Sequence, residues 1–96
     1  MAIEVRVPSI MRKLVNGAKT VQANGATVVR VLDDLEKRHP GFKERILNTD
    51  GGLNQFVAVY VNDEDIRFLK ELSTSVKDGD VITILPAVAG GQEAQL

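Results

Sequence analysis

The stretch that organises this chain is Val81-Ile82-Thr83-Ile84-Leu85, which leads into Pro86-Ala87-Val88-Ala89 and then Gly90-Gly91. Its β-branched and aliphatic residues favour a strand, and the preceding Asp78-Gly79-Asp80 favours the turn that starts it. Beyond Leu85 the run gives way to an extended segment. The two final glycines lack side chains, so they form a thin peptide that can enter a narrow channel.

Two further strands are expected near the N-terminus. Ile3 to Val7 alternates apolar and polar residues, which is the period of a half-buried strand, and Pro8 follows it. Asn16-Gly17 is a turn signal because both residues tolerate positive φ, and Lys19 to Ala23 follows as a second strand. The intervening segment from Ser9 to Val15 is too long for a tight hairpin, so an extended loop is expected there.

One main helix follows, with Thr27 as the residue that caps its first turn. The apolar residues that recur at the spacing of one buried helical face are Val28, Val31, Leu32 and Leu35. On the opposite face, Asp33–Lys37 and Asp34–Arg38 are expected to form ion pairs one helical turn apart.

The second half of the chain alternates turns with short regular segments. His39-Pro40-Gly41 ends the helix because proline cannot continue its hydrogen-bond ladder, and Phe42 to Leu47 makes a further short helical turn. Phe56 to Val61 is a continuous run of β-formers, which suits a central strand that is covered on both sides. Asn62 to Asp65 turns the chain, and Ile66 to Phe68 is expected to form a short strand.

The expected order is therefore strand, strand, helix, strand, short strand, strand. One helix between two hairpin-like halves packs on a mixed sheet, which defines an α+β roll. Placing the last strand beside the first produces the β-grasp (ubiquitin-like) topology, with about four to five strands packed on one main helix. The chain then divides into a β-grasp domain at 1–85, an extended stalk at 86–91 and a further tail at 92–96. Alternation along the last strand turns Ile82 and Ile84 inward and leaves Thr83 and Leu85 outside.

Composition argues against several classes of function. Twelve basic and thirteen acidic side chains give a net charge of −1, which argues against a general nucleic-acid binder. The absence of cysteine excludes disulfides, thiolate metal sites and cysteine nucleophiles. The segment Met1 to Arg6 has no hydrophobic signal character, and no apolar run is long enough to span a membrane. A cytoplasmic location without membrane contact is expected.

Three polar features are better explained by structure than by chemistry. His39, the only histidine, lies at the expected helix end, where it suits the helix dipole. Asp63-Glu64-Asp65 lacks the glycine and the spaced ligands of a calcium loop, so no metal site is expected there. Gly51-Gly52 does not precede a helix with a Lys-Ser/Thr pair, which argues against a phosphate-binding loop.

Three segments carry a resemblance to a known family. They are Val59-Tyr60-Val61-Asn62-Asp63-Glu64-Asp65-Ile66-Arg67, the turn Asp78-Gly79-Asp80, and the ending Pro86-Ala87-Val88-Ala89-Gly90-Gly91. Together with the strand order, they resemble the MoaD/ThiS family of ubiquitin-like sulfur carriers. Within this family, the resemblance is closest to the CysO-type carriers of cysteine biosynthesis, and it covers almost the whole chain.

The resemblance implies a carrier that is not itself an enzyme and binds no cofactor. An activating enzyme would use ATP to adenylate the carboxylate of Gly91, and a sulfur donor would displace AMP to leave a thiocarboxylate. The stalk that enters the partner's channel would consist of Pro86, Ala87, Val88, Ala89 and Gly90. Extended to Gly91, it would reach about 20 Å. The sulfur would pass to an accepting enzyme, which by resemblance is a PLP-dependent cysteine synthase.

The outward residues next to the stalk have two readings. Thr83 and Leu85 would form part of a docking patch for the activating and accepting enzymes. The alternative is that their pattern reflects ordinary packing of the sheet.

The residues from Gln92 to Leu96 depart from the mature pattern of the family. While a peptide bond joins Gly91 to Gln92, Gly91 has no free carboxylate to adenylate. Some carriers of this family are made with such an extension, and a JAMM-type metalloprotease trims it. We therefore expect cleavage between Gly91 and Gln92. The alternative is that the extension reflects cloning or a natural loss of function.

Other functions stay open. The sulfur could serve molybdopterin, thiamin, tRNA thiolation or a secondary metabolite, because the partner enzyme determines the acceptor. The same activated Gly91 could instead acylate lysines, as in a ubiquitin-like modifier. A β-grasp binding module with an inert tail would keep its function without Gly90 and Gly91.

Overall fold

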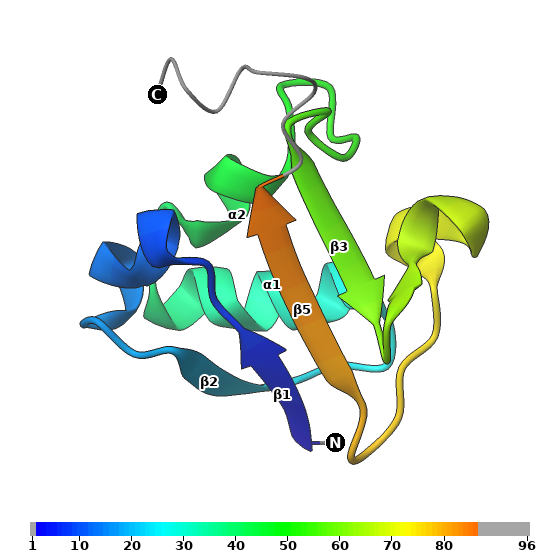
Figure 1. Ribbon diagram of the computed structural model, residues 1–96, viewed down its shortest axis with the longest axis horizontal. Helices are drawn as coiled ribbons and strands as arrows, with labels where there is room; N and C mark the ends of the chain where they lie inside the picture. The colour runs from blue at the N-terminus through cyan, green and yellow to red at the C-terminus, as the bar shows by residue number, and fades with distance from the viewer. Residues whose placement is uncertain (1, 87–96) are drawn as a thin grey trace.

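A computed structural model of the protein describes residues 2–86, which form a five-stranded mixed sheet and the helices packed around it (Figure 1). The strands are β1 (Ala2–Arg6), β2 (Thr20–Asn24), β3 (Val57–Val61), β4 (Glu64–Asp65) and β5 (Val81–Pro86). The helices are α1 (Val28–Arg38), α2 (Phe42–Ile46) and the 3-10 helices η1 (Ser9–Val15), η2 (Ile66–Phe68) and η3 (Glu71–Ser73). The sheet order β2-β1-β5-β3-β4 confirms the predicted β-grasp fold.

Strand β5 occupies the middle of the sheet. It pairs in parallel with β1, where Arg6 lies opposite Thr83, and antiparallel with β3, where Val57 lies opposite Pro86. The first and last strands therefore lie side by side, as expected (Figure 1). β5 extends one residue further than predicted, to Pro86. The Val57 carbonyl accepts from Arg67 at 3.0 Å and so faces away from β5, which means that proline's missing N–H removes no bond of this pair.

The core lies between the sheet and α1, which runs behind the strands in Figure 1. Ile82 and Ile84 of β5 are buried there as predicted. They share the core with the apolar face of α1, namely Val28, Val31, Leu32 and Leu35. Burying each such side chain contributes roughly 1.5–3 kcal/mol to stability. The predicted cap is also confirmed, because the Thr27 hydroxyl accepts from the backbone N–H of Arg30 at 3.4 Å.

The extended loop predicted for Ser9 to Val15 is wrong, because this segment forms η1. Pro8, with φ of −69°, precedes the helix, and its carbonyl accepts from the N–H of Met11 at 2.9 Å. Met11 and Val15 are buried, so the helical conformation turns two apolar side chains into the core. The predicted turn at Asn16-Gly17 is confirmed, since both residues adopt positive φ.

The short strand predicted for Ile66-Arg67-Phe68 is also wrong, because these residues form η2. The strand that pairs with the outer side of β3 is β4, and it lies inside the segment that was expected to be a turn. Asn62 and Asp63 make the reversal alone, with φ of 50° and 74°. The Asp65 carboxylate then accepts from the backbone N–H of Arg67 at 2.8 Å, which starts a helical turn and ends the strand.

The polar face of α1 covers the outer edge of β2. The predicted Asp34–Arg38 pair is confirmed, with Arg38 Nη2 2.8 Å from Asp34 Oδ2. Arg38 also donates to the carbonyl of Gln22 at 2.7 Å, and Asp34 accepts from the N–H of Asn24 at 3.0 Å. The hydrogen bond from Asn24, helped by Arg38, lowers the pKa of Asp34. Backbone groups satisfied in this way cannot template another strand.

The predicted Asp33–Lys37 pair is wrong, because Asp33 pairs with Lys43 of α2 instead. Glu36, one turn along α1, accepts from the backbone N–H groups of Gly41 at 3.1 Å and Lys43 at 2.9 Å. These bonds, first that from Gly41 and then that from Lys43, lower the pKa of Glu36. The two acidic side chains thus fasten the short α2 to α1.

Asn62 and Asp80 fix the start of β5. The Asn62 backbone N–H donates to the Val81 carbonyl at 2.9 Å, and its side-chain oxygen accepts from the Val81 N–H at 3.0 Å. The Asn62 amide donates to the Asp80 carboxylate at 3.0 Å, which also accepts from the N–H of Lys77 at 2.9 Å. The hydrogen bonds from Asn62 and Lys77 lower the pKa of the buried Asp80, so the charged form is favoured in the folded state.

Gly25 is expected to tolerate no side chain. A Cβ there would lie 2.6 Å from the backbone nitrogen of Val31 and 2.9 Å from the carbonyl carbon of Arg30, both in α1. Gly25→Ala should therefore lower the free energy of unfolding by about 1–3 kcal/mol, measured by urea denaturation. Gly52→Ala is the matched control, because its nearest neighbour would be the Asn48 side chain at 3.6 Å. Equal stability of the two variants would contradict this account.

Asp80 is expected to make the fold sensitive to acid. Its folded-state pKa lies below the ordinary 3.8, so its stabilisation is present above that value and is lost as the pH falls through the folded-state pKa. Asp80→Asn should cost about 1 kcal/mol at neutral pH and reduce the further loss of stability in acid. Urea unfolding across this pH range measures both effects, with Asp50→Asn in an exposed loop as control. Parallel curves for the wild type and Asp80→Asn below pH 4 would contradict it.

Candidate functional site

The predicted reactive residue and most of its stalk lie outside the described residues. Gly91, the segment from Ala87 to Gly90, and the Gly91–Gln92 cleavage site therefore stay predictions. The structure does describe Pro86, the first residue of the stalk, as the exposed last residue of β5. The candidate site is consequently the surface around the end of this central strand.

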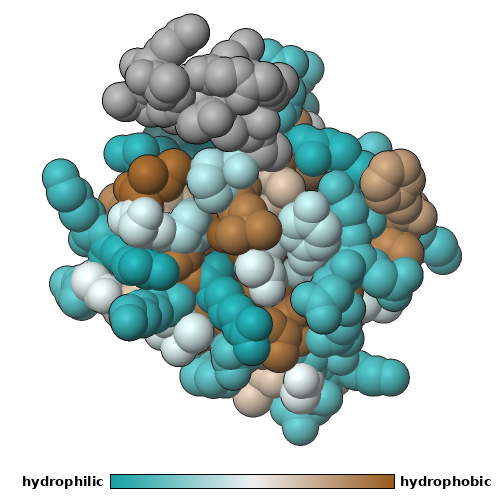
Figure 2. Space-filling model, in the orientation of Figure 1, coloured by the Kyte–Doolittle hydropathy of each residue, from teal (hydrophilic) through white to brown (hydrophobic). Residues whose placement is uncertain are grey.

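The outward face of β5 presents Thr83 and Leu85. In the register of the sheet, Thr83 lies between Arg6 of β1 and Tyr60 of β3, and Leu85 lies beside Ala58. Leu85 is 45% exposed and Thr83 is half-buried, so their predicted outward position is confirmed, while their docking role stays a prediction. Figure 2 shows this open face of the sheet, on which small hydrophobic areas are separated by polar ones.

Beside Leu85 lies a groove of about 290 Å³ that the sequence pattern did not reveal. Its apolar part includes Pro8 and Leu85, and three of its lining residues are basic: Arg6, Arg12 and Lys19. None of the residues that line it within the described chain is acidic. We call this surface the basic groove. The one signal available in the sequence was Arg6, which alternation of β1 places on the same face as Thr83.

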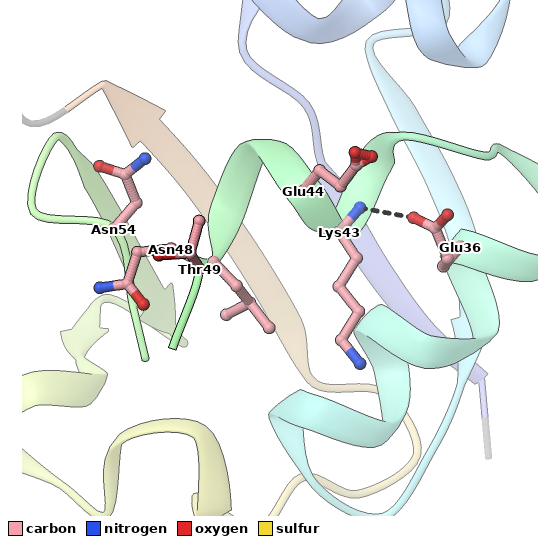
Figure 3. Close-up of a pocket in the computed structure, with 7 residues that line it drawn as sticks. Glu36, Lys43, Glu44, Asn48, Thr49 and Asn54 are labelled. Atoms are coloured by element: carbon pink, nitrogen blue, oxygen red, sulfur yellow. Dashed lines mark hydrogen bonds between the residues drawn. The ribbon is translucent and has the colours of Figure 1, made fainter. Parts of the chain in front are cut away.

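A larger hollow of about 830 Å³ lies where α1, α2 and the loop after α2 meet. Figure 3 shows its lining, with Glu36 bonded to the backbone nitrogen of Lys43 on one side and Asn48, Thr49 and Asn54 on the other. Because Glu36 already accepts two backbone hydrogen bonds, it serves to hold α2 in place. The described lining has no histidine or cysteine to act as a base or nucleophile.

The other polar features have structural partners. His39 lies at the C-terminal end of α1, where it was expected, with its backbone N–H 2.7 Å from the Leu35 carbonyl. Asp63 belongs to the β3–β4 reversal, and Asp65, the last residue of β4, starts η2. Within residues 2–86, no group of three acidic or histidine side chains is placed to hold a metal ion. Across the same residues, every helix is too short or too polar to cross a membrane.

Comparisons with known proteins bear on this site. The sequence pattern of the ThiS family matches residues 5–91. The sulfur carrier protein CysO of Mycobacterium tuberculosis is 47% identical over 93 residues, which cover 95% of this chain and 100% of that protein. Small archaeal modifier protein 3 of Haloferax volcanii is 33% identical over 94 residues, which cover 95% of this chain and 100% of that protein.

The same relationship is found among solved structures. A chain in the crystal structure of the Amycolatopsis orientalis BexX/CysO complex superposes with a TM-score of 0.87 at 52% identity. The superposition covers 94% of this chain and 100% of that one. The family match begins within β1, at residue 5, and runs through the other four strands to residue 91. This chain therefore belongs to the ThiS family.

Proposed function

We propose that this chain is a sulfur carrier, a protein substrate of partner enzymes and not an enzyme itself. Membership of the ThiS family and full-length similarity to proteins named sulfur carriers support the proposal. The observation that carries it is the position of β5. β5 pairs with β1 as far as Thr83 and with β3 as far as Pro86, so the segment that leads to Gly91 starts at the exposed end of a strand that the sheet supports.

The chemistry takes place at the carboxylate of Gly91. A carboxylate oxygen attacks the α-phosphorus of ATP on the activating enzyme, and pyrophosphate leaves. A sulfur nucleophile then attacks the acyl carbon, so a C–S bond forms and the C–O bond to AMP breaks. The resulting thiocarboxylate donates its sulfur to an accepting enzyme. We propose a PLP-dependent cysteine synthase that acts on an activated serine, in keeping with the similarity to CysO.

The stalk suits entry into a partner's channel. Pro86 and the β-branched Val88 restrict the backbone, which reduces the entropy lost on docking. Gly90 and Gly91 carry no side chains, so the reactive end fits a narrow site. Thr83 and Leu85, on the outward face of β5, contact the partner while the stalk is inserted.

The residues beyond Gly91 keep the carrier inactive until a JAMM-type metalloprotease cuts between Gly91 and Gln92. Intact-mass analysis of the protein isolated from its native cell should find the functional population ending at Gly91. A functional population that retains Gln92 and the residues after it would contradict this processing step.

The carrier function is tested by reconstitution with ATP, sulfide and an activating enzyme from the same organism. The chain ended at Gly91 should gain the mass expected when one oxygen is replaced by sulfur. The chain that retains Gln92–Leu96 should not, because its Gly91 lies in a peptide bond. Intact-protein mass spectrometry measures the gain, deletion of Gly90 and Gly91 should abolish it, and Gly52→Ala serves as the glycine control. A gain in the untrimmed chain, or none in the trimmed one, would count against the proposal.

A second candidate is a ubiquitin-like modifier, which the similarity to small archaeal modifier protein 3 favours. In this case the activated Gly91 acylates a lysine amine, and AMP leaves in the same way. Immunoblots of the native cell with an antibody against the chain separate the two functions. Ladders of covalent adducts that disappear when Gly91 is deleted indicate conjugation, whereas a thiocarboxylate mass without adducts indicates sulfur transfer alone.

A further inference from the structure

We propose that the basic groove beside Leu85 docks an acidic surface of the enzyme that activates Gly91. The inference rests on the proposed carrier function and adds the chemistry of the partner surface. The groove lies where β5 ends, and Pro86 follows Leu85 directly. A partner that draws the stalk into its own channel must therefore cover this part of the carrier.

Two of the three basic residues are bonded to the backbone of Val7, Lys19 through its main chain and Arg12 through its side chain. The N–H of Val7 donates to the carbonyl of Lys19 at 2.8 Å, and the carbonyl of Val7 accepts from Nε of Arg12 at 3.1 Å. Lys19, the residue before β2, and Arg12 of η1 therefore both line the groove, although they come from different segments. Arg12 is also half-buried, so its guanidinium loses little further freedom on binding.

The third cation comes from the sheet. Arg6 lies opposite Thr83 in the register of β1 and β5, and its side chain is 58% exposed. Its Nε lies 3.2 Å from the carboxylate of Glu4, which is also solvent-exposed. Exposed pairs of this kind are weak, so Arg6 can exchange Glu4 for a carboxylate of a partner at small cost.

The charge of the groove differs from that of the whole protein. The chain has a net charge of −1, yet three cations and no anion line the groove within the described residues. Guanidinium groups bind carboxylates through paired, charge-assisted hydrogen bonds, which favours Asp and Glu side chains as their partners. Leu85, which is 45% exposed, supplies apolar surface in the groove, against which the stems of such side chains can pack. An acidic protein surface therefore fits the groove in charge.

Charge reversal of the two exposed cations tests the inference. The double variant Arg6→Glu, Lys19→Glu, made in the chain ended at Gly91, is compared with wild type in ATP–pyrophosphate exchange by the activating enzyme. KM for the carrier should rise about tenfold, because two attractions become repulsions, while kcat is unchanged. The rise of KM with salt should also be shallower in the variant. Lys70→Glu, an exposed cation between η2 and η3, is the matched control and should behave as wild type.

The outcomes separate the two proposals. If wild type supports no exchange, the carrier function fails. If wild type supports exchange and the double variant has the same KM and salt dependence, the groove is not the docking site. A fall in kcat alone would also overturn the inference, because docking acts on KM.

Sedimentation of the chain without the enzyme completes the test. A wild-type dimer that the double variant abolishes would overturn the inference, because the groove would then be a self-association surface. Thermal unfolding and the conservative variant Arg6→Lys, Lys19→Arg, which should restore KM, exclude misfolding as the cause.

Discussion

The parallel pairing of β1 with β5 is the constraint on which the remaining structure depends. It joins Glu4 to Val81, so nearly the whole described chain lies in the connection between the two strands. Closing such a connection costs conformational entropy, which is offset by burial of Ile3 and Val5 of β1 with Ile82 and Ile84 of β5. Hydrogen bonds also offset this cost, because those of Asn62 to Asp80 and Val81 join the start of β5 to the β3–β4 reversal.

The same pairing positions the strand from which the proposed stalk continues. β1 lies beside β5 as far as Thr83, and β3 continues beside it from there to Pro86, so the position of Pro86 is set by β3. Strand alternation divides β5 into an inward row that belongs to the core and an outward row that includes Thr83 and Leu85. The inward row of β5 therefore fixes the strand in the core, and the outward row forms the surface next to the end of the strand.

The edges of the sheet, in contrast, are closed or short. Asp34 and Arg38 satisfy the outward backbone groups of β2, and β4 offers only two residues. A carrier with open edges would be prone to pair with other chains. Within residues 2–86, the surface left open for contacts is the free face of the sheet, on which Thr83 and Leu85 lie.

Signals that act over a few residues were readable from the sequence: the Thr27 cap, the buried face of α1, the alternation of β1 and β5, and the Asn16-Gly17 turn. The role proposed for Gly91 rests on the residues and their resemblance to a family, because the structure describes the chain only to Pro86. What required the folded molecule were features that depend on which segments meet. η1 forms because Met11 and Val15 are buried in the core. Asp33 pairs with Lys43 and not with Lys37 because α2 packs beside α1. η2 forms in place of a strand because the Asp65 carboxylate accepts from the N–H of Arg67.

The basic groove also required the folded molecule. Arg6, Arg12 and Lys19 are apart in sequence, and they meet Leu85 only through the register of the sheet and the backbone of Val7. Periodicity and capping are local, whereas a surface is the sum of long-range contacts.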